Sequence, residues 1–92
     1  RELGAPASLG QALEVAAAFE RSRDREAALR LLDEALAIES RPSRHLLRGD
    51  ILSERDEAAA RRAWHAGLAA AHPDSVWASR ARARLEDARP HG

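Results

Sequence analysis

Two histidines and an aspartate in the last third of the chain are the side chains best suited to bind a metal ion. His65 and His72 are seven residues apart, so both lie on one side of the helix expected there, and Asp74 follows closely. Structural and catalytic zinc sites need at least three converging ligands, and no other ligand type points to this place. We therefore interpret His72 as a helix C-terminal residue, where positive charge is favourable, and His65 as a surface residue.

The chain contains no cysteine, no glycine-rich phosphate loop and no HExxH pair. No Ser-His-Asp arrangement has local support, because Ser22, Ser53 and Ser79 fit turns or exposed surface. Adjacent acidic residues such as Asp33 and Glu34 fit a solvated helix face. We therefore predict no catalytic residue, no cofactor site and no metal site, and expect a protein that is not an enzyme.

Arginines near the C-terminus are the remaining chemical feature, and the group comprises Arg80, Arg82, Arg84 and Arg89. A guanidinium group pairs well with carboxylates and phosphates. One interpretation is therefore a contact for an acidic peptide or nucleic acid. The other is the solvated outer face of a terminal helix, since acidic residues partly neutralise the group. Fifteen basic residues balance fifteen acidic ones in the whole chain, which argues against general nucleic-acid binding.

The residues that would carry such contacts sit in segments with helical spacing. Alanine, leucine, glutamate and arginine dominate the 92 residues, whereas threonine is absent and valine and isoleucine are scarce. This composition predicts one all-α domain over 1–92. Apolar spacing and stop signals place five helices, at about 8–21, 24–39, 43–54, 56–71 and 75–88.

Capping and breaking residues set the expected helix ends. Ser8, Asp24 and either Asp74 or Ser75 are candidate N-caps, and the segment 40–42 breaks the second helix at a proline. Gly49 inside the third helix costs about 1 kcal/mol relative to alanine, which makes sense if a neighbouring helix comes close. The connections span only a few residues, so consecutive helices are expected to pack antiparallel.

The second and fourth helices resemble each other at an offset of 32 residues. Asp24 corresponds to Asp56, small residues correspond to small ones and bulky residues to bulky ones. The bulky and small positions of the two copies are Ala28, Leu32, Ala35 and Leu36 in the first, and Ala60, Trp64, Gly67 and Leu68 in the second. This pattern is expected when successive helical hairpins make equivalent contacts.

The pattern resembles the tetratricopeptide repeat family. In this family the first helix of a repeat carries a small residue followed three residues later by a large one. Ala16 with Phe19 matches this pattern in the first copy, and Gly49 with Leu52 matches it in the second. Pro73 stands near the position of the proline that closes a repeat. The resemblance implies repeats over about 9–40 and 43–73 and a solvating helix over about 75–88. An unrelated five-helix bundle is the alternative.

The resemblance also implies a concave groove lined by the odd-numbered helices, where partners of this family most often bind. Carried over by position, this partner-binding groove comprises Leu13, Ala17, Glu20, Arg21, Leu46, Asp50, Glu54, Arg80 and Arg84. It would be acidic in the middle and basic toward the C-terminal end. Some family members grip a C-terminal carboxylate with lysines and asparagines, and this chain contains neither.

These observations predict a non-enzymatic adaptor, scaffold or assembly subunit that binds a protein or peptide within a larger complex. The alternatives are an accessory domain of a larger envelope or regulatory complex, and an acidic-ligand or nucleic-acid contact through the C-terminal arginines. No apolar run approaches the roughly 20 residues that span a bilayer. The absence of lysine suggests a GC-rich bacterial source, with the cytoplasm and the periplasm both open as compartments.

Overall fold

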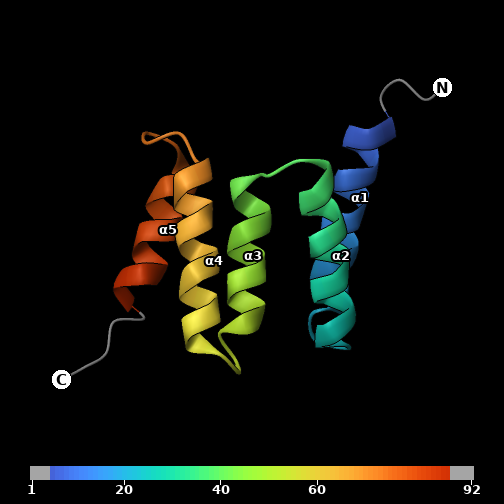
Figure 1. Ribbon diagram of the computed structural model, residues 1–92, viewed down its shortest axis with the longest axis horizontal. Coiled ribbons are helices and arrows are strands. Elements are labelled where there is room, and N and C mark those ends of the chain that lie inside the picture. The colour runs from blue at the N-terminus through green and yellow to red at the C-terminus, as the bar shows by residue number, and fades with distance from the viewer. Residues whose placement is uncertain (1–4, 88–92) are drawn as a thin grey trace. The chain divides into compact units, whose positions relative to one another are not determined.

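The computed structural model describes residues 5–87, with side chains from Ser8 onward, and this part of the chain is all-α. It contains five helices and no strand (Figure 1). The helices are α1 (Ala5–Glu20), α2 (Arg25–Ile38), α3 (Pro42–Leu52), α4 (Glu57–Ala70) and α5 (Val76–Asp87). The predicted fold class is therefore confirmed at the level of helix content. The predicted end of the last helix at Ala88 lies outside the described residues.

Two predicted helix starts are wrong by one to three residues, and both involve a proline. The first helix begins at Ala5 rather than at Ser8, so Pro6 lies in its first turn. The third begins at Pro42 rather than at Ser43, with Arg41 as its N-cap. A proline in the first turn removes an N–H that has no intrahelical partner anyway, so it starts a helix as readily as it breaks one.

The turns between α1 and α2 and between α3 and α4 have matching hydrogen bonds at positions 32 residues apart. The Asp24 carboxylate accepts from the Ala27 amide at 3.1 Å, and the Asp56 carboxylate accepts from the Ala59 amide at 3.0 Å. Before each cap the aspartate amide donates to the carbonyl four residues earlier, at 2.7 and 2.8 Å. Asp24 is thus confirmed as an N-cap, and Asp56 has the same role.

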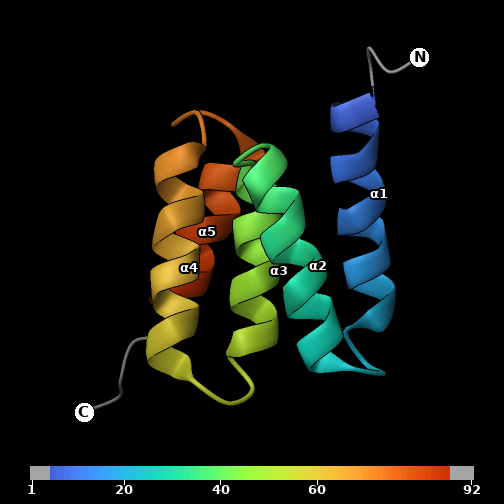
Figure 2. The same ribbon diagram turned by 45° about the vertical axis from the view of Figure 1, so that its right-hand side comes forward.

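The chain forms two compact units, Arg1–Ser40 and Arg41–Gly92, and the boundary falls between the two predicted copies. In unit 1, α1 packs against α2 as a helical hairpin (Figure 2). Its fully buried apolar residues are Ala17, Ala28, Leu32 and Ala35.

The buried side of α1 differs from the one that the sequence predicts, which is the apolar stripe formed by the spacing of Leu9, Ala12, Leu13, Ala16 and Phe19. Leu9 and Phe19 are 54% and 74% exposed, whereas Gly10 and Ala17 are buried and Leu13 is half-buried. Gly10 and Ala17 are seven residues apart, so they lie on one side, and small side chains let a helix pack closely there. Close packing along this small-residue side leaves the bulkier stripe facing solvent.

In unit 2, α4 packs against both α3 and α5, and α3 also contacts α5. The core cluster contains Leu46, Ala60, Trp64 and Ala81, with Leu52, Leu68, Trp77 and Leu85 packed against it. Ala63 and Gly67 are buried too. The apolar spacing of the fourth helix predicts an inward face of Ala60, Ala63, Trp64, Gly67 and Leu68, and this face is confirmed, with Leu68 partly buried. Trp64 therefore belongs to the core of this three-helix unit, and Trp77 is half-buried at its edge. None of the described helices is long and apolar enough to cross a membrane.

Candidate interaction surface

Four residues of the expected groove lie in unit 1. Ala17 is fully buried and offers no atoms to a partner, while Leu13 and Glu20 are half-buried and Arg21 is exposed. The Glu20 carboxylate lies 3.7 Å from the guanidinium of Arg23, three residues later. Glu20 and Arg21 are therefore the polar members of this group that reach solvent.

The other five lie in unit 2 and differ in exposure. Leu46 is only 2% exposed and belongs to the core, so it stabilises the unit and contributes no apolar contact to a groove. Asp50 and Arg84 are half-buried, whereas Glu54 and Arg80 are exposed. Three of them, on α3 and α5, are brought together by direct contacts: Asp50, Arg80 and Arg84.

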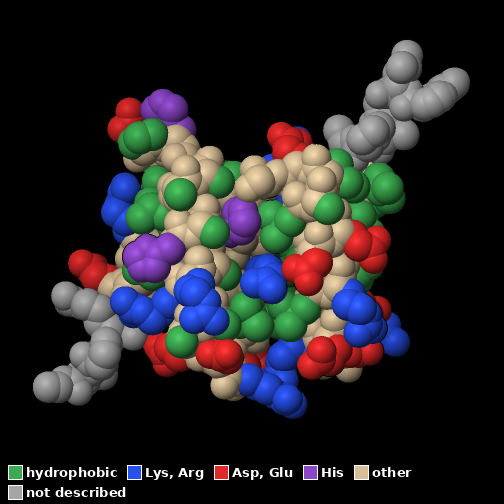
Figure 3. Space-filling view, viewed as in Figure 1, with side chains coloured by type: hydrophobic (Ala, Val, Ile, Leu, Met, Phe, Trp, Pro, Cys, Tyr) green, Lys and Arg blue, Asp and Glu red, His purple; other side chains and the backbone are tan. Residues whose placement is uncertain are grey.

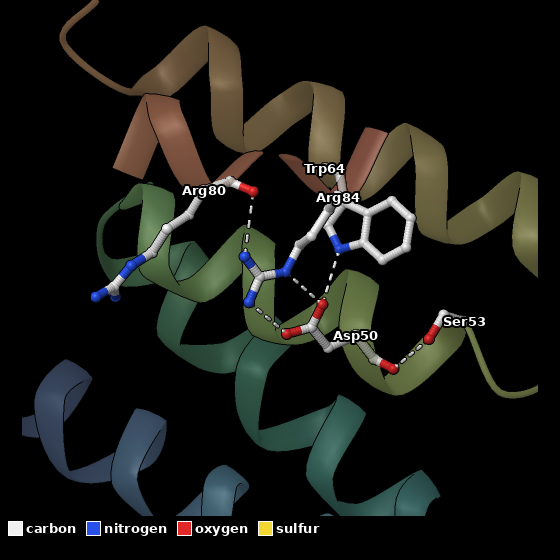
Figure 4. Close-up of polar contacts among 5 residues, drawn as sticks. All are labelled: Asp50, Ser53, Trp64, Arg80 and Arg84. Atoms are coloured by element: carbon white, nitrogen blue, oxygen red, sulfur yellow. Dashed lines mark hydrogen bonds and ion pairs between the residues drawn. The ribbon is translucent and has the colours of Figure 1, made fainter. Parts of the chain in front are cut away.

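The Asp50 carboxylate joins all three helices of unit 2 (Figure 4). Its Oδ1 atom accepts a hydrogen bond from Trp64 Nε1 at 3.0 Å, from α4, and another from Arg84 Nε at 2.7 Å, from α5. Its Oδ2 atom accepts from Arg84 Nη2 at 2.9 Å. The guanidinium thus binds the carboxylate through two parallel donors, the strongest geometry for this pair. We call Asp50, Trp64 and Arg84 the Asp50 network.

Gly49 explains how the indole reaches Asp50. A Cβ at this position would lie 2.5 Å from both Cδ1 and Nε1 of Trp64 and 3.0 Å from the Ala60 carbonyl oxygen. Only a residue without a side chain lets α3 and α4 come this close. The expectation that a neighbouring helix approaches Gly49 is therefore confirmed, and the neighbour is α4.

The Asp50 carboxylate favours the charged form of the Arg84 guanidinium. The hydrogen bonds from Arg84 to Asp50 raise the pKa of the guanidinium, partial burial opposes this effect, and the Asp50 charge adds to it. Arg84 Nη1 also donates to the Arg80 carbonyl oxygen at 3.2 Å within α5. The acidic middle and the basic end expected for the groove therefore neutralise each other where Asp50 meets Arg84.

Arg80 presents its positive charge to solvent instead. Its guanidinium carbon lies 4.9 Å from the centre of the Trp77 ring, a cation–π distance, and its side chain points away from Asp50 (Figure 4). In the view of Figure 3, further arginine and histidine side chains gather over α3 and α4. Residues 41–92 contain ten arginines and seven acidic residues, so this part of the chain is formally positive although the whole chain has a net charge of zero.

Of the two histidines considered as zinc ligands, His72 has a local structural role and His65 is exposed. His72 Nδ1 accepts a hydrogen bond from the Asp74 amide at 3.2 Å, and the His72 carbonyl accepts from Ser75 Oγ at 2.7 Å. Ser75 Oγ also accepts from the Ala78 amide at 3.2 Å, so Ser75 rather than Asp74 caps α5. Among residues 5–87 there is no group of three side chains placed to hold a metal ion.

His45 gives the stability of unit 2 a predictable pH dependence. Burial lowers the pKa of His45 below its usual 6.5, and the nearby charge of Arg48 lowers it further. The unfolded chain then binds the proton more tightly, so this stability contribution is present above pH 6.5 and is lost as the pH falls through the folded pKa. We expect the urea concentration at the unfolding midpoint to decrease as the pH is lowered from 7.5 to 5. In the His45→Gln variant the midpoint should depend less on pH. The exposed His65→Gln variant serves as control, and an unchanged slope in His45→Gln would contradict this assignment.

Sequence reasoning placed Asp50 and Arg84 on one surface but did not pair them. They are 34 residues apart on different helices, and residue types alone do not reveal which charges meet. The useful signal was Gly49, because a glycine in a helix beside an acidic residue marks a close approach that brings a neighbouring donor within reach.

Comparison with known proteins identifies no relative: no family model, no curated protein and no solved structure matches this chain.

Proposed function

We propose that this chain is a tetratricopeptide-like module, an adaptor, scaffold or assembly subunit that binds a protein or peptide partner without catalysing a reaction. The observation that carries the proposal is the correspondence between its two hairpins. Cap, turn and helix length recur 32 residues apart, from Asp24 with α2 to Asp56 with α4, each helix having 14 residues. Repeated hairpins of this kind are most often used to present extended binding surfaces.

Within this proposal, the surface of α5 around Trp77 and Arg80 is the contact for an acidic segment of the partner. Arg80 is exposed, and it makes no ion pair with a described residue. The Trp77 ring restricts the motion of the Arg80 guanidinium that stacks on it. The Arg80 side chain therefore loses less conformational entropy when it binds a carboxylate. Arg84 contributes less, because its donors already bind Asp50 and the Arg80 carbonyl.

The nucleic-acid alternative is weakened by the same contacts. Of the three described arginines at the C-terminal end, Arg84 is paired with Asp50, which leaves Arg80 and Arg82 exposed. Two exposed arginines supply a small salt-dependent term compared with the six to ten phosphate contacts of typical DNA-binding proteins. An accessory role in a larger envelope or regulatory complex is compatible with the proposed module. In that case the chain would bind a partner in the same way, as one part of a larger assembly.

A peptide-display selection on the full chain, followed by titration of the selected peptides, tests the proposal. We expect enrichment of segments with at least one acidic residue, and we expect Arg80→Glu to weaken their binding at least tenfold. Arg62→Glu, which changes an exposed arginine of α4, is the matched control for net charge and should bind as the unmodified chain does. Failure to enrich any peptide, or equal weakening by both variants, would contradict the proposed surface.

A further inference from the structure

The first turns of α5 carry an exposed apolar side chain beside the arginine that stacks on Trp77. Val76 is the first residue of the helix and is 54% exposed. It lies four residues before Arg80, so the two side chains are neighbours on one side of the helix. Trp77 is half-buried and packs against the core of unit 2, which holds its ring in place. We call Val76, Trp77 and Arg80 the α5 surface.

The positive charge of this surface is open to a ligand. Arg80 is exposed, and its side chain points away from Asp50, whose carboxylate is already bound by two donors of Arg84 (Figure 4). Glu86 and Asp87 follow Arg80 by six and seven residues, or about 9 to 10 Å along the helix axis. A carboxylate that approaches Arg80 from the start of α5 therefore stays clear of both acidic residues.

The order of side chains along α5 separates an apolar part from a charged part. Val76 lies toward the start of the helix, on the other side of Arg80 from Glu86 and Asp87. Asp74 precedes Val76 by two residues and is exposed, so it would repel a second carboxylate there but not an apolar side chain. The surface is thus complementary to a ligand whose apolar group lies over Val76 and whose carboxylate lies over Arg80.

We propose, on the basis of the peptide-binding function proposed above, that the segment bound by the α5 surface carries an apolar side chain beside its acidic one. The Cβ atoms of Val76 and Arg80 are about 6 Å apart by helix geometry. Alternate residues of an extended segment and residues three or four apart in a helix have a similar spacing. The partner is therefore a protein segment with an aliphatic or aromatic residue two to four positions from an aspartate or glutamate.

The two parts of the surface have different roles in binding. An ion pair with the exposed Arg80 is screened by salt and contributes little affinity by itself. Apolar contact with Val76 and with the part of Trp77 that reaches solvent removes water from both partners and is not screened. The apolar residue of the segment therefore supplies much of the affinity, and the acidic residue selects the segment and sets its direction along α5.

Val76→Ser tests the apolar part in a peptide-display selection and titration with the full chain. Val76 is exposed and begins α5, so the substitution leaves the core unchanged. Loss of the apolar contact should weaken binding of the selected peptides about three- to tenfold. Val15→Ser, the same change at an exposed valine of α1, is the matched control and should bind as the unmodified chain does.

Replacing the apolar residue of a selected peptide with alanine tests the contact from the partner's side. Binding to the unmodified chain should weaken about three- to tenfold, and binding to the Val76→Ser chain by less than about twofold, because the contact is already lost there. Equal weakening toward both chains would overturn this assignment of Val76, as would selection of acidic peptides without an apolar preference. Either result leaves peptide binding through Arg80 standing, whereas failure to enrich any peptide contradicts both proposals.

Discussion

Replacing Gly49 with alanine is expected to lower the free energy of unfolding of unit 2 by about 2 kcal/mol. The new methyl group would lie 2.5 Å from the indole of Trp64, a side chain that is 94% buried and cannot move away without displacing the core. Overpacking of this kind costs about 1 to 3 kcal/mol, and a displaced indole also loses its hydrogen bond to Asp50, worth about 1 kcal/mol. Better helix propensity returns about 1 kcal/mol of this loss. Urea unfolding followed by tryptophan fluorescence measures the change.

Gly67→Ala is the matched control for this prediction. Gly67 is also a buried glycine within a helix, but a Cβ there would lie 3.2 Å from His45 Cβ and Leu46 Cδ2, so small shifts relieve the contact. The gain in helix propensity then offsets the strain, and we expect a change within about 0.5 kcal/mol of zero. If the two variants lost equal stability, the close approach of α3 and α4 at Gly49 would not be the cause.

Local chemistry made much of the fold predictable from sequence. Asp24 was identified as a cap from its type and position, and it accepts the expected hydrogen bond. Gly49 indicated a close helix, and α4 lies there. The inward face of the fourth helix followed from the spacing of Ala60, Ala63 and Trp64. Caps, glycines and periodicity act within a few residues of the chain, so the sequence displays them directly.

The features that sequence reasoning missed depend on which helices meet and on which side. Leu9 and Phe19 have the spacing of a buried stripe, yet Gly10 and Ala17 are the buried residues because small side chains permit the closest packing. Leu46 was assigned to a partner surface and lies in the core. A leucine on a helix fits a core and an interface equally well, since both bury apolar area. Tertiary packing decides between them.

Replacing Asp50 with alanine is expected to destabilise unit 2 by about 2 to 3 kcal/mol. The carboxylate is the acceptor for the Trp64 indole N–H and for two donors of Arg84. Its loss therefore leaves the part-buried indole N–H without its acceptor and the Arg84 cation with only the Arg80 carbonyl. Arg84→Ala should cost less, about 1 to 2 kcal/mol, because Asp50 keeps the Trp64 hydrogen bond. Asp50→Asn separates the effect of charge from that of hydrogen bonding. The asparagine oxygen still accepts from Trp64, but its NH2 group faces the donors of Arg84 and cannot accept from them. We therefore expect a loss of stability of about 2 kcal/mol, between that of Arg84→Ala and that of Asp50→Ala. Urea unfolding of all three variants gives the free energies.

A double-mutant cycle measures the coupling free energy between Asp50 and Arg84 and shows whether this ion pair stabilises unit 2. The Arg84 and Asp50 side chains are 32% and 20% exposed and are bound through two parallel hydrogen bonds, so we expect a coupling energy of about 1 to 2 kcal/mol that declines only modestly in 1 M salt. Arg82→Ala, on the exposed side of α5, is the control and should change stability by less than about 0.5 kcal/mol. A coupling below about 0.3 kcal/mol would place Asp50 and Arg84 among ordinary exposed ion pairs. Retained coupling, by contrast, means that Arg84 is committed to holding α5 against α3, which leaves Arg80 and Arg82 as the exposed basic residues of α5 and Arg80 as the one that stacks on Trp77.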